Sequence, residues 1–189
     1  MKPKTTDPEK KGIIDTNTKS MEDIIANAIL QTIQSNQQLL ALPCAQKAKF
    51  ENWLKFELAY RLKVLVPDTV VEYKIPNGNK FIDIKSGNSY IELKTTNTNV
   101  AIPLLSPQAT KPITQNINDI ISDVNNLRKF VIGDACSRYV ATIFFPYNDS
   151  QGLHLKRLRE HINSNPSANI IEIDTGINTV PVRIFVARV

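Results

Sequence analysis

The chain has 189 residues, and its 42% hydrophobic and 22% charged residues are typical of one globular domain with a proper core. No apolar run is long enough to cross a bilayer, and the N-terminus lacks the apolar core of a signal peptide, so we expect a cytoplasmic protein without a membrane partner. The net charge of +5 is compatible with a polyanionic partner but is too modest to establish one.

Absent motifs argue against several classes of chemistry. Cys44 and Cys136 lack a Cys-x-x-Cys spacing, which argues against a zinc site or a disulfide framework, and we expect both to be reduced and structural. The sequence has no Gly-rich phosphate loop and no Gly-x-Ser-x-Gly elbow, which argues against ATP-driven and triad chemistry. His154 and His161 lie beside no other candidate ligand or nucleophile, so neither is given a catalytic role.

The N-terminal part of the chain divides into a tail and a helix. Residues 1–19 have almost no apolar content, so we expect a flexible tail that is dispensable for activity, followed by a single domain over residues 20–189. Ser20 is a candidate N-cap for an amphipathic helix that runs toward Leu40, before Pro43. This helix could form a dimer interface, but packing against the core is the favoured interpretation.

A second helix is predicted from about Ala45 to Lys63. Its apolar stripe is formed by Phe50, Trp53, Leu54, Leu58, Leu62 and Leu65. Glu57 falls inside this stripe, and a carboxylate on a buried face needs a partner. That partner is either a site that the helix faces or Arg61, one turn further on. Glu51 lies nearly on the same side of the helix and is the reserve candidate.

The next three predicted strands carry the candidate chemistry. A strand over Val70–Ile75 ends in a Pro-Asn-Gly-Asn turn, and two further runs, Phe81–Lys85 and Tyr90–Thr96, flank Ser86-Gly87-Asn88 as a β-hairpin. Because side chains alternate along a strand, Glu92 and Lys94 share one face, and strand pairing can bring Asp83 beside them.

Asp83, Glu92 and Lys94 suit metal-assisted hydrolysis of a phosphodiester. Two close carboxylates repel each other unless a cation lies between them, and hard oxygen ligands suit Mg²⁺, which binds through one or two carboxylates and keeps several waters. A neighbouring lysine can hold or deprotonate the attacking water, or neutralise charge that develops on the phosphate. The alternative is a solvated strand face with a weak ion pair.

Asp83 followed by Glu92-Leu93-Lys94 resembles the active-site signature of the PD-(D/E)XK nucleases, the restriction-endonuclease-like superfamily. The spacing fits a tight hairpin, although Ile82 stands where the name-giving proline would be. The resemblance implies that Asp83 and Glu92 bind the metal and that the Leu93 backbone carbonyl is a further ligand. It also implies that Lys94 is the catalytic lysine and that Glu57, on the helix before the first core strand, faces the metal as a catalytic residue.

The rest of the chain completes an α/β pattern. A polar loop over Asn97–Lys111 contains an apolar island, Val100–Leu105, and is long enough to close over a substrate. The following elements are a helix from Pro112 to Val131, a doubly covered central strand over Tyr139–Phe145, a helix over Leu153–Asn163, and an antiparallel strand pair over Asn169–Asp174 and Val180–Val189. Weaker candidates for contacts with nucleic acid are Lys74, Thr96, Gln115, Lys156 and Arg157.

These observations favour a restriction-endonuclease-like α/β fold, a mixed sheet flanked by helices, with its nuclease core over about residues 45–145. The expected function is Mg²⁺-dependent cleavage of double-stranded DNA, with Mn²⁺ able to substitute, possible dimerisation and a type II-like restriction role. Two alternatives stay open. The fold can serve as a non-catalytic nucleic-acid-binding module, or the chain can be an immunity-type factor that binds another protein.

Overall fold

The fold is built on one six-stranded mixed sheet with the strand order β1-β2-β3-β4-β6-β5. The computed structural model describes residues 19–76, 79–100, 111–129 and 136–189. The elements are α1 (Met21–Ser35), α2 (Gln37–Ala45), α3 (Glu51–Leu65), β1 (Val70–Lys74), β2 (Phe81–Ser86), β3 (Ser89–Asn97), α4 (Ile113–Lys129), β4 (Ser137–Phe145), η1 (Asp149–Gln151), α5 (Gly152–Asn163), β5 (Ile170–Ile177) and β6 (Val180–Arg188). The prediction of a mixed α/β domain is confirmed. No helix in these ranges is both long and apolar enough to cross a membrane.

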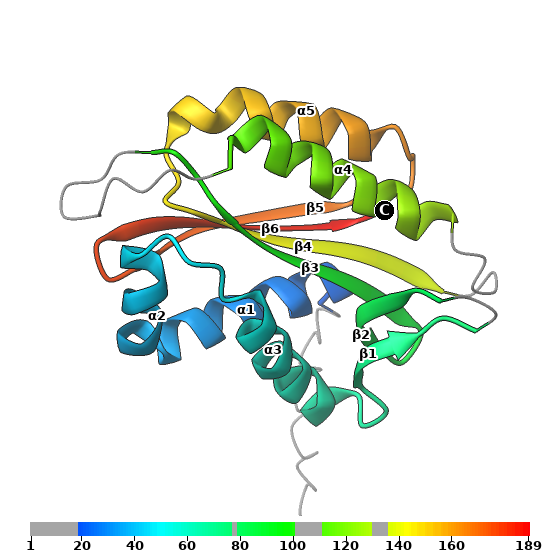
Figure 1. Cartoon of the computed structure of the whole chain (residues 1–189). Coiled ribbons are helices and arrows are strands. Elements are labelled where there is room, and N and C mark those ends of the chain that lie inside the picture. The colour runs from blue at the N-terminus through cyan, green and yellow to red at the C-terminus, as the bar shows by residue number, and fades with distance from the viewer. Residues whose placement is uncertain (1–18, 77–78, 101–110, 130–135) are drawn as a thin grey trace, which may run out of the picture.

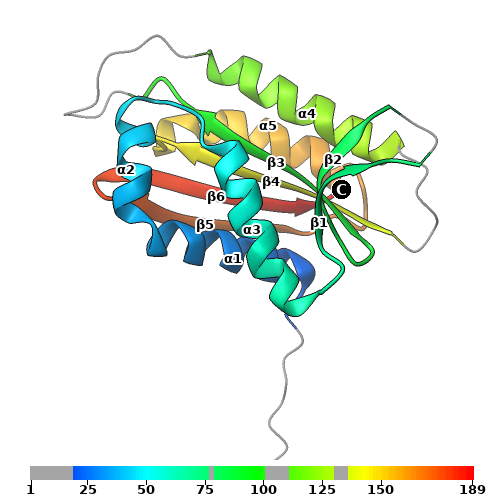
Figure 2. The same cartoon turned by 60° about the horizontal axis from the view of Figure 1, so that its bottom comes forward.

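Helices cover both faces of the sheet, with α4 and α5 on one face and α1, α2 and α3 on the other (Figures 1 and 2). Strand β4 contributes to two hydrophobic cores, because Ala141 and Ile143 pack toward α1 and α3 while Val140 and Phe144 pack toward α4 and α5. These side chains are fully buried, as the continuous apolar run predicted. Strand β3 pairs with β4 in parallel, and every other pair in the sheet is antiparallel.

The first predicted helix is interrupted. Ser20 caps α1 through a reciprocal pair of hydrogen bonds with Asp23, as the N-cap prediction anticipated. The helix ends at Ser35, because the backbone of the next residue, Asn36, leaves the helical region, and the Asn36 side-chain amide donates to the Thr32 carbonyl at 2.8 Å. The chain then restarts as α2, which contains Pro43. The prediction of one continuous helix to Leu40 is therefore wrong.

Helix α2 is tied to the far end of the chain. The Gln37 side chain donates to the Gly176 carbonyl at 2.8 Å and accepts from the Asn178 backbone N–H at 2.6 Å. Asn178 has a φ of 52° in the turn between β5 and β6, a left-handed conformation that Asn tolerates better than most residues. One amide therefore joins the N-terminal helices to the C-terminal hairpin.

Strands β2 and β3 pair for only part of their length. The pairing covers Ile84 with Ile91, Lys85 with Tyr90 and Ser86 with Ser89, and Gly87 makes the connecting turn with a φ of 56°. Beyond Ile91, β3 continues to Asn97 and pairs only with β4. The edge of β3 that faces away from β4 therefore carries backbone groups without a strand partner, and we call this place the notch.

The middle of the Pro-Asn-Gly-Asn turn, residues 77–78, and the end of the helix predicted to run to Val131 lie outside the described ranges, and two longer segments do so almost entirely. They are the flexible tail, apart from Lys19, and the loop after β3 with its apolar island, apart from its first and last residues.

Candidate active site at the edge of strand β3

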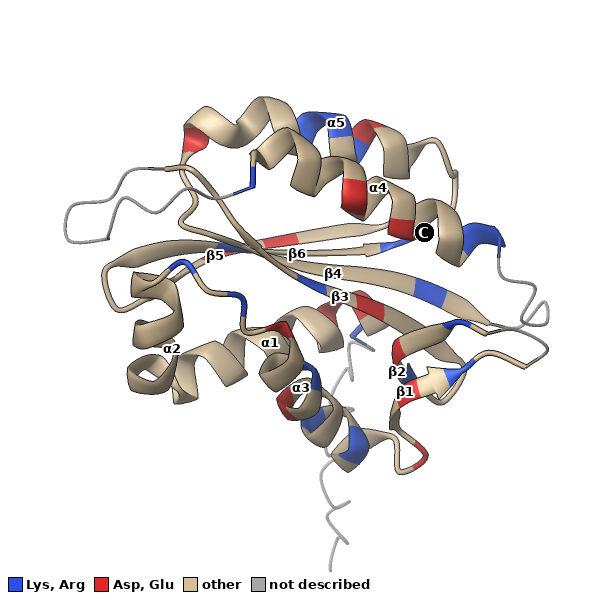
Figure 3. Cartoon of the chain, viewed as in Figure 1, with Lys and Arg blue, Asp and Glu red and all other residues tan. Residues whose placement is uncertain are grey.

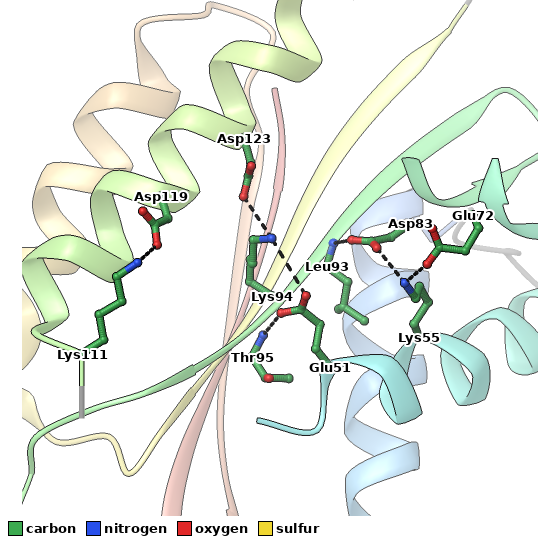
Figure 4. Close-up of polar contacts among 10 residues, drawn as sticks. All are labelled: Glu51, Lys55, Glu72, Asp83, Leu93, Lys94, Thr95, Lys111, Asp119 and Asp123. Atoms are coloured by element: carbon green, nitrogen blue, oxygen red, sulfur yellow. Dashed lines mark hydrogen bonds and ion pairs between the residues drawn. The ribbon is translucent and has the colours of Figure 1, made fainter. Parts of the chain in front are cut away.

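In the notch, two carboxylates accept the hydrogen bonds that β3 would otherwise donate to the carbonyl groups of a neighbouring strand. Asp83 of β2 accepts from the Leu93 backbone N–H through Oδ2 at 2.9 Å. Glu51, in the first turn of α3, accepts from the Thr95 backbone N–H through Oε2 at 2.9 Å. Figure 4 shows both contacts on successive outward N–H groups of β3. Because backbone N–H groups away from water need partners, the fold fixes both carboxylates beside β3.

Lys94 stands between carboxylates from two layers. Its Nζ atom lies 3.3 Å from Oδ2 of Asp123 on α4 and 3.9 Å from Oε1 of Glu51, and its side chain is 27% exposed. Burial lowers the pKa of Lys94, but the charges of Glu51, Asp123 and Glu92 outweigh it and leave this pKa above its usual value. Lys94 is therefore an ammonium at neutral pH, suited to neutralising negative charge rather than to accepting a proton.

Glu92 lies next to Asp83, and the two carboxyls interact strongly. Burial, the Asp83 carboxylate and the more weakly acting Asp123 raise the pKa of Glu92 to about 9, and Lys94 offsets them only in part. A carboxyl perturbed in this way keeps a proton at neutral pH unless a cation replaces it. Burial also raises the pKa of Asp123. Burial therefore disfavours the charged form of both carboxyls, Glu92 and Asp123.

A second lysine reaches the same group from α3. The Lys55 ammonium is paired with Glu72 of β1 and lies 3.0 Å from Oδ1 of Asp83. Burial lowers the pKa of Lys55, but the hydrogen bonds and charges of Glu72 and Asp83 outweigh it, so the net shift is upward. Figure 3 shows acidic and basic positions gathered where α3 faces β1, β2 and β3.

Asp83 contacts the backbone of β3 at Leu93, between Glu92 and Lys94 in the sequence, and the charges of both Asp83 and Lys94 act on Glu92. The N–H and C=O of one strand residue point to the same edge, and the Leu93 N–H lies in the notch. The Leu93 carbonyl therefore faces the notch as well. The roles of these residues stay predictions.

The carboxylate that α3 places beside Lys94 is not Glu57, as expected from the sequence, but Glu51. Within the described ranges Glu57 has no ion pair or side-chain hydrogen bond, and the helix carboxylate that reaches the group is Glu51, the reserve candidate. The buried face of α3 is centred on Leu54, Leu58 and Leu62. Glu51 precedes Leu58 by nearly two full turns and shares its face, whereas Glu57 is turned about 100° away.

The weaker nucleic-acid candidates are dispersed. Thr96 is buried and lines a pocket of about 300 Å³ beside Lys94, together with Lys49, Asn116 and Asp123. The other four are exposed: Gln115 on α4, Lys74 at the end of β1, and Lys156 and Arg157 on α5. Lys156 lies 3.8 Å from Glu160 on its own helix, an ordinary surface ion pair.

Asp123 and Lys55 were not predicted. Asp123 adjoins Val124 in the apolar stripe of α4, and Lys55 lies within the buried face of α3. A charged residue at such a position is the available signal, but it does not identify the partner. The cysteines are both free, and burial raises the pKa of Cys44 to about 12.

The donor set fits a hard cation in its chemistry. It consists of the Asp83 and Glu92 carboxyls and the Leu93 carbonyl, all oxygen. Oδ2 of Asp123 is a buried oxygen that receives no hydrogen bond, although Lys94 lies within ion-pair distance. Among residues with described placement, no group of three or more His, Cys, Asp or Glu side chains is arranged to hold a metal. An ion such as Mg²⁺, which keeps most of its water ligands, would need only a few protein oxygens such as these.

Comparison of the chain with models of protein families, with curated proteins and with solved structures finds no match.

Proposed function

We propose that the chain is a Mg²⁺-dependent DNA endonuclease with a restriction-endonuclease-like fold. The observation that carries the proposal is the contact of the Asp83 carboxylate with the Leu93 N–H in the notch, between Glu92 and Lys94 on β3, where β2 no longer pairs with β3. The order of elements supports it. Helix α3 precedes the antiparallel strands β1, β2 and β3, and α4 then leads to β4, which is parallel to β3. This order agrees with what the resemblance to PD-(D/E)XK nucleases implies.

In this proposal Asp83, Glu92 and the Leu93 carbonyl would hold Mg²⁺, or Mn²⁺ in its place. A bound ion supplies Lewis-acid polarisation of the phosphate and a water of lowered pKa. Lys94 stabilises the negative charge that develops on the phosphate, because its ammonium stays charged beside Glu51 and Asp123. Glu51 positions both Lys94 and the β3 backbone.

The test is incubation of plasmid and short duplex DNA with the full chain in Mg²⁺ or Mn²⁺, followed by gel analysis. Cleavage is expected with either ion and is abolished by EDTA. A fixed band pattern indicates a type II-like restriction enzyme, and a smear indicates cutting without sequence preference. Lys94→Met should slow single-turnover cleavage by about 10²–10³-fold, the usual effect of losing a group that acts on transition-state charge. Absence of cleavage of duplex or single-stranded DNA, with either ion, would refute the proposal.

Glu51 and Glu57 form a matched pair of variants on one helix. Glu51→Gln weakens the contacts to Thr95 and Lys94, so we expect a large loss of cleavage rate. Glu57→Gln removes a charge from the other side of α3 and should cleave at the parent rate. The opposite result would return the helix role to Glu57.

A homodimer would place two such sites on the two strands of a duplex, with the sites related by a two-fold axis. The mass in solution, measured by light scattering with and without DNA, tests this part of the proposal. A monomer in both conditions that still makes double-strand breaks in one binding event would contradict it.

One observation favours a second candidate, a nucleic-acid-binding module without catalysis. Both lysines of the site are already paired with carboxylates, as in a structural ion-pair network. Duplex binding that weakens with salt, without cleavage and without Mn²⁺ binding, would favour this function.

A further inference from the structure

The buried ammonium of Lys55 lies where two carboxylates from different strands meet. Its side chain is only 6% exposed, although it belongs to one of the residue types that are seldom fully buried. It pairs with Glu72 of β1 and with Oδ1 of Asp83, so the charge of Asp83 is shared with a fixed cation of the chain (Figure 4). Burial of a charge is tolerated only with such partners.

The Asp83 carboxylate is engaged at both oxygens. Oδ1 faces Lys55 at 3.0 Å, and Oδ2 accepts from the Leu93 N–H at 2.9 Å. The position outside Oδ1, toward Glu72, is therefore held by an ammonium. On the side toward Glu92 the cation is Lys94, whose charge offsets the burial of Glu92 and the charge of Asp83 only in part.

Glu72 reaches Lys55 at a conformational cost. Its φ of 50° is left-handed, a conformation that non-glycine residues in strands rarely adopt. Its side chain is 53% exposed, yet it turns inward to the buried ammonium. The contact is thus specified by the fold rather than being a chance surface pair.

We propose that the Lys55 ammonium takes the place of a second metal ion, so that the site binds one divalent cation. Two-metal phosphodiesterases hold their ions about 3.5–4 Å apart, with both ions neutralising charge at the reacting phosphate. A shared carboxylate in the position of Asp83 would serve both ions, and here its outer oxygen is occupied by Lys55. Lys55 is then a positioning residue that fixes Asp83. It also supplies a positive charge that, unlike a bound ion, cannot dissociate from the protein. The inference rests on the proposed function.

The test counts Mn²⁺ ions bound to the full chain by calorimetric titration and by electron paramagnetic resonance, without DNA. The parent protein should bind one ion. Lys55→Gln removes the charge at nearly constant length and frees Asp83 and Glu72, so it should bind two ions with spin–spin coupling between them. Lys63→Gln, on an exposed part of the same helix, is the matched control and should bind one.

Each result decides the matter. Two ions on the parent protein would overturn the inference even if Lys55→Gln fails to fold, which circular dichroism will show. One ion on both the parent and a folded Lys55→Gln variant would also overturn it, because Lys55 would then be only an ion-pair partner. No Mn²⁺ on the parent protein would instead refute the metal site and with it the proposed function. As a second readout, the Mg²⁺ dependence of cleavage should be hyperbolic for the parent and sigmoidal for Lys55→Gln.

Discussion

Glu92→Gln tests the electrostatics of the site through stability rather than activity. The folded protein raises the pKa of Glu92 from its usual 4.5 to about 9, so between these values the folded state keeps a proton that the unfolded chain has lost. Stability therefore falls as pH rises through this interval. Glutamine has the shape of the protonated carboxyl and does not titrate, so the variant should escape this loss.

The magnitude follows from one proton. A single linked proton changes the free energy of unfolding by about 1.4 kcal/mol for each pH unit, so from pH 6 to pH 8 the variant should gain about 2.7 kcal/mol over the parent. Comparing the variant with the parent at each pH removes other titrating groups, among them His161. The quantity to compare is therefore the slope of the stability difference between Glu92→Gln and the parent against pH.

The assay is urea unfolding at pH 6, 7 and 8 in EDTA. Glu160→Gln is the control, because this carboxylate is 65% exposed and paired only with Lys156 on the same helix. Its stability should run parallel to that of the parent. A difference between Glu92→Gln and the parent that stays constant across the three pH values would mean that Glu92 is ionised like an ordinary surface glutamate. The inference that burial and the Asp83 carboxylate raise the pKa of Glu92 would then be wrong.

Three further predictions concern the cation and the fold. Mn²⁺ affinity in calorimetry should rise up to tenfold per pH unit between pH 6 and 8, because Glu92 must release its proton to bind; affinity independent of pH would contradict this role. Leu58→Ala should lower the free energy of unfolding in urea by about 3 kcal/mol because Leu58 is fully buried, whereas Leu65→Ala, 64% exposed, should change it by less than about 0.5 kcal/mol; equal losses would mean that α3 is oriented differently. Ser20→Ala should cost about 1 kcal/mol in thermal unfolding by removing the cap of α1, and an unchanged midpoint would show that this cap does not stabilise the domain.

The strands and their pairing were predictable because their signals are local. A turn at Gly87 between two β-rich runs fixes the pairing of neighbouring strands, and alternation then places Glu92 and Lys94 on one face near Asp83. The central strand was equally clear, since its continuous apolar run has no exposed face.

The helix residues of the site were harder to predict, because they depend on how each helix is rotated against the sheet. Several apolar stripes could be drawn along α3, and the one that includes Trp53 points to Glu57, whereas the buried face selects Glu51 and Lys55. Lys94 belongs to β3 and Asp123 to α4, and residues 98–112 separate these two elements in the sequence. No local spacing therefore reveals the pair. The break at Asn36 was missed because the apolar pattern continues through it.

The Gln37 link has a consequence for synthesis on the ribosome. The residues of the notch and its two lysines lie between Glu51 and Asp123, yet the layer of helices below them is joined through Gln37 to the turn after β5. Strand β6 follows the other five strands of the described sheet in sequence but lies between β4 and β5, so the nascent chain cannot complete this sheet until residues 180–188 emerge. The sheet should therefore be completed only after β6 has emerged, later than the residues of the site.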